Sequence, residues 1–477
     1  MTTRNIRRGL AAIAALNLLA GGLYLVHRAS NGTSIAVGTV TGRGRPFGSD
    51  DDLSPGDDGD NTLTNADGGS DWVGGLATTS TTANLTDGDP SPTDTTDTTD
   101  GSHEPTTTTT VQPRPAPPSP DYPNDAVSFQ LDNGHTGGRD DPSLPDNLHV
   151  LWSKEVGGQL GYSLIVGDKV FVSDAGLHAY DRETGAEIWS GAGGGELAYD
   201  HGHLFAKDEG AGVQSFDAKT GALQWSFEVQ SSRPDIGGWG SGPAVAADGI
   251  VYVPYGPDLA AVDERDGSLL WQAMVNWGGA VFMPALSGYS VYAVTGCTYP
   301  FAYDTETGAN LWNTPRECAI GESRNAPAFY NGHLYTRYYP ADGHDFVYDT
   351  SGNEVRGFRS DNAPAFHGNV GYYMAAGSLE AHNLSTGALL WSNAGMGTSE
   401  MPPLAVGDRV FAVDASGVLH AYDGGTGNEL GSFATGGTFD VFRDNPGFEY
   451  AFPPIIGMTE ARGVLIVSVG TKLIAFG

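Results

Sequence analysis

Four side chains that could perform acid–base or nucleophilic chemistry lie close together in the stretch HAYDRETGAEIW. They are His178, Asp181, Glu183 and Thr184. An imidazole beside carboxylates can transfer protons near neutral pH, and a hydroxyl next to a base can act as a nucleophile. Related stretches follow it along the chain, namely QSFDAKTGALQW, AAVDERDGSLLW, FAYDTETGANLW and EAHNLSTGALLW. Because the Asp or Asn, the Gly and the Trp recur in these stretches, we interpret the motif as structural.

Each copy of the motif predicts one tight turn between two strands. The Asp accepts hydrogen bonds from backbone N–H groups of the turn, and the Gly adopts a positive φ without a Cβ clash. The large, flat Trp is expected to fill the space between neighbouring units. The residues in these roles are Asp181, Gly185, Trp189, Asp217, Gly221, Trp225, Asp263, Gly267, Trp271, Asp304, Gly308, Trp312 and Trp391. Two degenerate copies are expected to end at Phe358 and Phe433.

The spacing of the motif predicts the fold. It returns about every forty residues in an all-strand pattern, which is typical of a β-propeller with one four-stranded blade per repeat. Seven repeats end at Phe433, and FPPIIGMTEARGVLIVSVGTKLIAFG supplies three further strands. The missing outer strand occurs near the start, in NLHVLWSKEV, with Trp152. We therefore predict an all-β, eight-bladed β-propeller whose ring is closed by an N-terminal strand.

The residues before the propeller differ in composition from it. Residues 1–30 hold a basic flank and an uncharged stretch from Gly9 to Val26, which predicts a signal-anchor helix. A cleaved signal peptide is the alternative. Residues 31–120, rich in Thr, Asp and Pro, predict a disordered linker, and residues 121–477 form the propeller. We expect a single-pass membrane protein with its propeller outside the cytoplasm, or a secreted one if the signal is cleaved. The net charge of −33 argues against nucleic acid as a partner.

The Asp-x-x-Thr-Gly-x-x-x-Trp repeat on eight blades resembles the pyrroloquinoline-quinone-type propeller family, the quinoprotein alcohol dehydrogenase-like fold, over about residues 126–477. That family contains quinone-dependent dehydrogenases and non-enzymatic members, among them an envelope scaffold and kinase sensor regions. For a dehydrogenase the resemblance implies a disulfide between adjacent cysteines, a Trp floor beneath the quinone, and Glu, Asn and Asp ligands to Ca²⁺. This chain has no adjacent cysteines, and none of those calcium ligands maps onto it. We therefore place it in the non-enzymatic branch and expect neither pyrroloquinoline quinone nor another cofactor.

The two cysteines, Cys297 and Cys318, are expected on one face of the propeller. In a blade, the loop between the second and third strands shares a face with the connection to the next blade, and each cysteine lies in one of these segments of the fourth blade. We predict a disulfide, with two free thiols as the alternative. A metal site is disfavoured because no His cluster completes a zinc shell.

The long connections on the same face carry the candidate binding residues. Exposed loops on a rigid frame are where binding residues concentrate, and aromatic and Arg side chains are typical of protein contacts. The candidates are Arg233, Trp239, Trp277, Arg324, Glu400, Asp440 and Arg443. For the two Trp, packing beneath the loops is the competing interpretation. We expect a scaffold or sensor that binds a protein or a cell-wall glycan; a quinone-dependent dehydrogenase with a reduced site and a carbohydrate-active enzyme are the alternatives.

Overall fold

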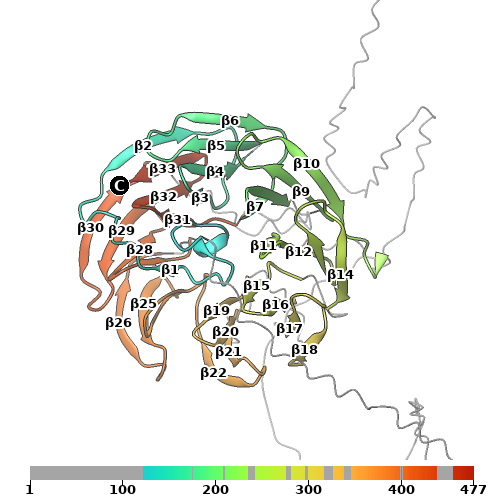
Figure 1. The fold of residues 1–477 in the computed structure, drawn as a ribbon. Helices are drawn as coiled ribbons and strands as arrows, with labels where there is room; N and C mark the ends of the chain where they lie inside the picture. The colour runs from blue at the N-terminus through green and yellow to red at the C-terminus, as the bar shows by residue number, and fades with distance from the viewer. Residues whose placement is uncertain are drawn as a thin grey trace, which may run out of the picture. The chain divides into compact units, whose positions relative to one another are not determined.

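The computed structural model describes residues 122–477 apart from 175, 208–209, 235–241, 276–280, 296–298, 316–325, 338–344, 398, 400 and 438–454. These residues form eight antiparallel sheets of four strands each, arranged as blades around a centre (Figure 1). One blade also takes up the two-residue strand β1 (Gly138–Arg139), which pairs in parallel with β27. The prediction of an eight-bladed propeller with four-stranded blades is confirmed.

Each of the first seven blades consists of four consecutive strands, given from the inner to the outer strand. Blade 1 comprises β3 (Leu164–Val166), β4 (Lys169–Ser173), β5 (Leu177–Asp181) and β6 (Glu187–Gly191), and blade 2 comprises β7 (Glu196–Asp200), β8 (His203–Lys207), β9 (Gly212–Asp217) and β10 (Leu223–Glu228). Blade 3 comprises β11 (Val245–Ala247), β12 (Ile250–Tyr255), β13 (Asp258–Asp263) and β14 (Leu269–Met274), and blade 4 comprises β15 (Ala285–Ser287), β16 (Ser290–Val294), β17 (Pro300–Asp304) and β18 (Asn310–Asn313). Blade 5 comprises β19 (Ala328–Tyr330), β20 (His333–Thr336), β21 (Asp345–Asp349) and β22 (Glu354–Phe358). Blade 6 comprises β23 (Ala365–His367), β24 (Val370–Ala375), β25 (Ser378–Asn383) and β26 (Leu389–Ala394). Blade 7 comprises β27 (Leu404–Val406), β28 (Arg409–Val413), β29 (Val418–Asp423) and β30 (Glu429–Ala434).

Blade 8 is assembled from both ends of the propeller sequence. It contains β31 (Met458–Ala461), β32 (Val464–Val469), β33 (Lys472–Phe476) and, as its outer strand, β2 (Val150–Glu155). β2 pairs antiparallel with β33, with Trp152 opposite Ala475. The predicted closure by an N-terminal strand is thus confirmed.

The hydrophobic core lies between neighbouring sheets. One cluster joins Phe205 and Val213 of blade 2 to Val251 and Val262 of blade 3, and all four side chains are fully buried. The second strands of the blades are buried on both faces, whereas the outer strands alternate between exposed and half-buried residues, as in β30. This gradient explains why the sequence of the inner strands is apolar and that of the outer strands is mixed.

The motif turns have one common geometry. In blade 1 the Asp181 carboxylate accepts hydrogen bonds from the backbone N–H and the hydroxyl of Thr184, at 2.8 and 2.6 Å. The same pair of bonds occurs at Asp217, Asp304, Asn383 and Asp423. Gly221 in blade 2 has φ +72°, and a Cβ added there would lie 2.6 Å from the ring of Trp189 in blade 1.

The Trp of one blade docks on the motif turn of the next. Its indole N–H donates a hydrogen bond of 2.8 to 3.2 Å to the carbonyl of the residue that follows the motif Asp. The donor and acceptor pairs are Trp152 and Arg182, Trp189 and Ala218, Trp225 and Glu264, Trp271 and Thr305, Trp312 and Thr350, and Trp391 and Gly424. The motif therefore connects consecutive blades, since its Gly and its turn carbonyl both receive the preceding Trp.

The two degenerate repeats correct one expectation. The residue in the Trp position is Arg356 in blade 5 and Gly431 in blade 7, opposite Val347 and Ala421, and not Phe358 or Phe433. In blade 5 the turn is one residue shorter than in the other repeats, which shifts the register of the outer strand. In blade 7 the neighbouring blade 8 has no motif turn to receive an indole, because its outer strand comes from a distant part of the chain.

The predicted signal-anchor helix and linker lie outside the described residues. Within the part of the chain that is described, no helix has the length and apolar character needed to cross a bilayer.

Candidate functional site

Of the candidate binding residues, Arg233 is described, and it lies just after β10 in the connection from blade 2 to blade 3. It is half-buried. The neighbouring Ser232 donates hydrogen bonds from its N–H and hydroxyl to Asp258, the fully buried first residue of β13, at 2.7 and 2.5 Å. The start of this connection is therefore anchored to the next blade. The other candidates lie outside the described residues, namely Trp239, Trp277, Arg324, Glu400, Asp440 and Arg443, as do Cys297 and Cys318.

A segment before the first blade, residues 125–139 and here called the lead-in segment, contacts the innermost strand of every blade. It includes the short 3₁₀ turn η1 (Phe129–Leu131) at the centre of the ring (Figure 1). In each blade the contacted residue lies two positions before the turn that ends the innermost strand. These residues are Ile165, Tyr199, Ala246, Leu286, Phe329, Phe366, Ala405 and Glu460. Six of them donate a backbone N–H to a lead-in carbonyl, Ala246 accepts from the Asn133 side chain at 2.8 Å, and Glu460 lies 3.9 Å from Arg139.

The lead-in segment lies at the motif-turn face of the ring. The turn that ends an innermost strand is hydrogen-bonded to the motif turn of the same blade, as in the bond from Ala218 N–H to the Gly202 carbonyl at 2.9 Å and from Glu264 N–H to the Gly249 carbonyl at 3.0 Å. Because the lead-in residues bind next to these inner turns, they close the centre of the ring on that face. The connections between blades lie at the opposite ends of the strands, so the two faces of the propeller are built differently.

Two ionisable side chains are enclosed where the lead-in segment meets the blades. His135 is fully buried, its Nδ1 lies 2.7 Å from the Pro327 carbonyl, and burial lowers its pKa to about 4. Burial raises the pKa of Glu460 to about 9, against the opposing effect of Arg139. At neutral pH both groups are therefore uncharged. Neither reaches solvent, so we assign them to the interior of the lead-in contact and not to catalysis.

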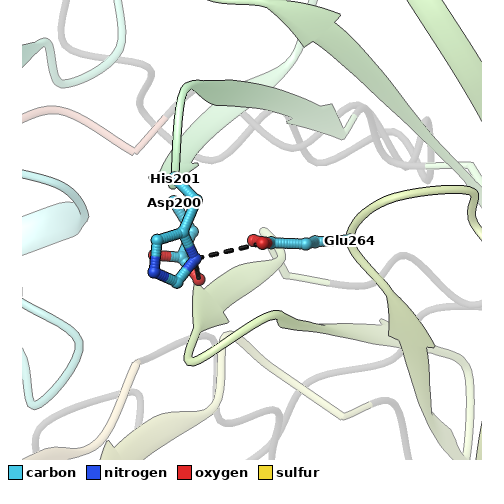
Figure 2. Close-up of side chains that lie close together, drawn as sticks. All are labelled: Asp200, His201 and Glu264. Atoms are coloured by element: carbon cyan, nitrogen blue, oxygen red, sulfur yellow. Dashed lines mark hydrogen bonds and ion pairs between the residues drawn. The ribbon is translucent and has the colours of Figure 1, made fainter. Parts of the chain in front are cut away.

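A second cluster lies between blades 2 and 3, at the motif-turn face. Asp200 is the last residue of β7, His201 opens the following turn, and Glu264 belongs to the motif turn after β13. The Nδ1 atom of His201 lies 3.2 Å from Oδ2 of Asp200 and 3.0 Å from Oε1 of Glu264 (Figure 2). Asp200 and Glu264 are buried, whereas the His201 side chain is 41% exposed. Burial and, to a smaller extent, the neighbouring Glu264 raise the pKa of Asp200 to about 6, although the Gly249 N–H and His201 oppose the shift.

No sequence pattern links these three residues. Glu264 comes from the next repeat, and each residue occupies an ordinary turn position in its own blade. The one unusual feature is His201 itself, which adopts φ +40° in a two-residue turn before Gly202. Asp248, Asn331 and Arg462 hold the same place in blades 3, 5 and 8, so a comparison of the turns would have singled out the imidazole.

A small hollow lies at the opposite ends of the strands, between blades 7 and 8. It has a volume of about 260 Å³ and is lined by residues that include Glu155, Thr471 and Lys472. Thr471 donates to Glu155 at 3.1 Å, and Lys472 donates to the Thr435 carbonyl at 2.9 Å. These polar groups are already engaged with the protein, and the hollow is smaller than a typical ligand pocket.

The eight four-stranded blades, with a Trp docked on the following motif turn at six of the junctions, define a quinoprotein-like β-propeller. The chain belongs to the family described as outer membrane protein assembly factor BamB, which matches residues 145–277, 257–362 and 353–438. The resemblance inferred from the repeat is thereby confirmed.

Individual relatives have different activities. The chain is 22% identical over 234 residues to the outer membrane protein assembly factor BamB of Shewanella oneidensis, covering 46% of this chain and 58% of that protein. It is 25% identical over 219 residues to tetrathionate hydrolase of Acidithiobacillus ferrooxidans, covering 40% of this chain and 43% of that protein. In both cases the similarity spans less than two thirds of the relative.

Two solved structures show the same fold at low identity. BamB from Moraxella catarrhalis superimposes with a TM-score of 0.53 at 19% identity, over 69% of this chain and 97% of that chain. A europium-containing methanol dehydrogenase gives a TM-score of 0.58 at 13% identity, over 74% of this chain and 98% of that chain. Since the BamB structure and the dehydrogenase structure match about equally well, the fold does not distinguish between their functions.

The cluster of Asp200, His201 and Glu264 differs in composition from the calcium site that the resemblance implies for a dehydrogenase. That site needs Glu, Asn and Asp ligands. Among the residues that the structure describes, the one group of three or more potential His, Cys, Asp or Glu metal ligands is Asp200, His201 and Glu264. It contains an imidazole and lies at two surface turns, so we derive no reaction through a quinone.

Proposed function

We propose that the chain is a protein-binding scaffold whose propeller is held outside the cytoplasm by the segment 1–30. The observation that carries the proposal is membership of the BamB family over residues 145–438, combined with a ring whose two faces differ. One face is closed by the lead-in segment, which contacts all eight blades. The partner therefore binds at the other face, where the connections between blades lie.

The construction of the ring supports this role. Six interblade Trp hydrogen bonds and the lead-in contacts fix the blades relative to one another. When the blades are fixed in this way, partner binding needs to order only the loops between them, so the loss of conformational entropy on binding is small. The longest of these connections, residues 229–244, 314–327 and 435–457, carry five of the seven candidate binding residues.

Co-purification tests the proposal. The full chain is isolated from cell envelopes in mild detergent, and the partner retained is quantified for the parent and for Arg233→Ala, Trp239→Ala and the control Lys219→Ala. Lys219 is exposed in the motif turn of blade 2, on the opposite face. We expect a stoichiometric protein partner that is lost in the first two variants and kept in the control.

Parallel assays address the alternatives. Purified chain is tested for quinone-dependent dye reduction in the presence of Ca²⁺, for hydrolysis of tetrathionate, for hydrolysis of glycans, and for binding to cell-wall glycan. Turnover in any enzyme assay contradicts the scaffold proposal. Glycan binding without a protein partner contradicts the choice of a protein partner and supports the cell-wall alternative.

A further inference from the structure

We propose that Asp200, His201 and Glu264 bind one divalent transition-metal ion between blades 2 and 3. The proposal concerns the motif-turn face and does not depend on the scaffold function, which uses the other face. It rests on the convergence of three ligand atoms, on one buried carboxylate oxygen without a hydrogen-bond donor, and on the rigid support of both turns.

Three potential ligand atoms converge on one point. Nδ1 of His201 faces Asp200 at 3.2 Å and Glu264 at 3.0 Å, and all three ligand atoms lie within 4.8 Å of one another (Figure 2). Zinc bonds to N and O ligands are about 2.0–2.2 Å long, so neighbouring ligands in a tetrahedral or octahedral shell are about 3.0–3.4 Å apart. The distances from Nδ1 to the two carboxylates fit such a shell.

Two other histidines show why this geometry is unusual. His420 in β29 contacts Asp414 through Nε2 at 3.4 Å and Glu429 through Nδ1 at 2.9 Å. His178 in β5 likewise contacts one carboxylate through each ring nitrogen. In both, the carboxylates lie on opposite sides of the ring and cannot share an ion with a single nitrogen. Nδ1 of His201 carries at most one N–H, so one linear hydrogen bond from it reaches only one of the two facing carboxylates.

A buried carboxylate oxygen in the cluster has no hydrogen-bond donor among the described residues. It is Oε2 of Glu264, whose side chain is 9% exposed and points towards His201 (Figure 2). A buried polar atom without a partner is costly, and native proteins usually satisfy such atoms with a protein group, a water or an ion. A cation held by His201 and by the carboxylates of Asp200 and Glu264 adds an interaction to the Glu264 carboxylate and offsets the repulsion between the two carboxylates.

Hydrogen bonds from the surrounding backbone hold the ligands in place. The Gly249 N–H donates to Oδ2 of Asp200 at 3.0 Å, and the His201 N–H donates to the Tyr122 hydroxyl at 2.8 Å. The Glu264 backbone is fixed by its own bond to the Gly249 carbonyl and by the Trp225 indole, which donates to the Glu264 carbonyl at 2.8 Å. Supporting contacts of this kind orient ligands in metal sites.

The donor set selects the class of metal. Imidazole favours ions such as Zn²⁺, Ni²⁺ and Cu²⁺, whereas Mg²⁺ and Ca²⁺ prefer shells made of oxygen. Two carboxylates balance the charge of a divalent ion. Three protein ligands leave at least one position open, and the exposure of the His201 side chain places that position next to solvent, where water or a ligand can occupy it.

Zinc titration of the full chain tests the proposal. Metal-free protein is titrated calorimetrically with Zn²⁺ for the parent, Glu264→Gln, His201→Asn and the control His420→Asn. Gln is isosteric with Glu, and Asn tolerates the positive φ of residue 201, so both variants are expected to keep the parent's far-ultraviolet circular dichroism. We expect one Zn²⁺ equivalent in the parent and the control, with affinity weakened by about tenfold or more in the two site variants.

Bound Co²⁺ provides a second measurement. Its visible absorption bands should appear in the parent and the control and be lost in Glu264→Gln, while an excess of Mg²⁺ should not displace the ion. The proposal is overturned if the parent binds no Zn²⁺, if the site variants bind it as tightly as the parent, if the control also loses it, or if Mg²⁺ competes effectively.

Discussion

Each Trp docks on the next motif turn. We therefore predict that two glycine-to-alanine substitutions, at positions with nearly the same backbone geometry, lower the unfolding free energy by different amounts. Gly221 has φ +72° and lies in the motif turn, where an added Cβ would be 2.6 Å from the ring of Trp189. Gly332 has φ +75° in an inner turn of blade 5, and an added Cβ would have nothing within 4 Å. Both substitutions to Ala introduce the same backbone strain, so the difference between their losses of unfolding free energy isolates the effect of the Trp contact.

The expected magnitudes follow from these two effects. A left-handed conformation costs an L-residue about 1–2 kcal/mol, which is the whole expected loss for Gly332→Ala. Forcing a methyl group against a packed ring adds about 1–3 kcal/mol, so Gly221→Ala should lose about 2–5 kcal/mol of unfolding free energy. Replacing Trp189 by Ala removes the clashing ring, and in that background the cost of Gly221→Ala should fall to that of Gly332→Ala.

The assay is equilibrium unfolding in urea, followed by far-ultraviolet circular dichroism so that the loss of an indole does not affect the signal. The double-mutant cycle of Gly221→Ala and Trp189→Ala gives the coupling between the two positions directly. Equal costs for Gly221→Ala and Gly332→Ala, or a coupling near zero, would refute the claim that the motif Gly exists to receive the Trp of the preceding blade.

Three further outcomes are expected. In the parent, the pKa of Glu460 is raised to about 9 in the folded state, so between pH 7 and 9 the folded protein keeps a proton that the unfolded chain releases. The unfolding free energy of the parent therefore falls by about 1.4 kcal/mol per pH unit as pH rises, and Glu460→Gln should flatten this dependence. An unchanged slope in urea titrations at several pH values would argue against the buried, neutral carboxyl. Asn133→Ala should lower the unfolding free energy by about 1 kcal/mol, because it removes the lead-in contact with blade 3; a neutral effect in the same assay would show that this contact does not stabilise the ring. Trp225→Phe should cost about 1 kcal/mol through the lost bond to the Glu264 carbonyl, and it should also weaken Zn²⁺ binding, whereas Trp271→Phe should match the stability loss but leave the metal affinity unchanged.

The repeat allowed much of the fold to be predicted. A turn motif every forty residues or so fixed the number of blades, and the unpaired strand at Trp152 identified how the ring closes. Two local details were not predictable, namely the Trp positions occupied by Arg356 and Gly431. They depend on a shortened turn and on the absence of a receiving turn in blade 8, which become visible only when the strands are aligned in register.

The lead-in contacts and the cluster of Asp200, His201 and Glu264 could not be predicted from single repeats. The lead-in segment has no secondary-structure periodicity, and its contacts with eight inner strands arise from its position at the centre of the ring. His201 and Glu264 are separated by a whole repeat and meet because consecutive blades place an inner turn beside a motif turn. Sequence patterns report local periodicity well, but they do not report which turns of different repeats become neighbours.

Face-specific photo-crosslinking in living cells tests whether a protein partner binds at the connection face of the propeller. A photoreactive residue is introduced into the full chain at Gln230 or Ser416, exposed at the connection face, and at Lys219 or Glu306, exposed in motif turns on the closed face. The scaffold account predicts a discrete protein adduct from the first pair and none from the second. Adducts from the motif-turn face alone, equal adducts from both faces, or no adduct at any position would contradict it.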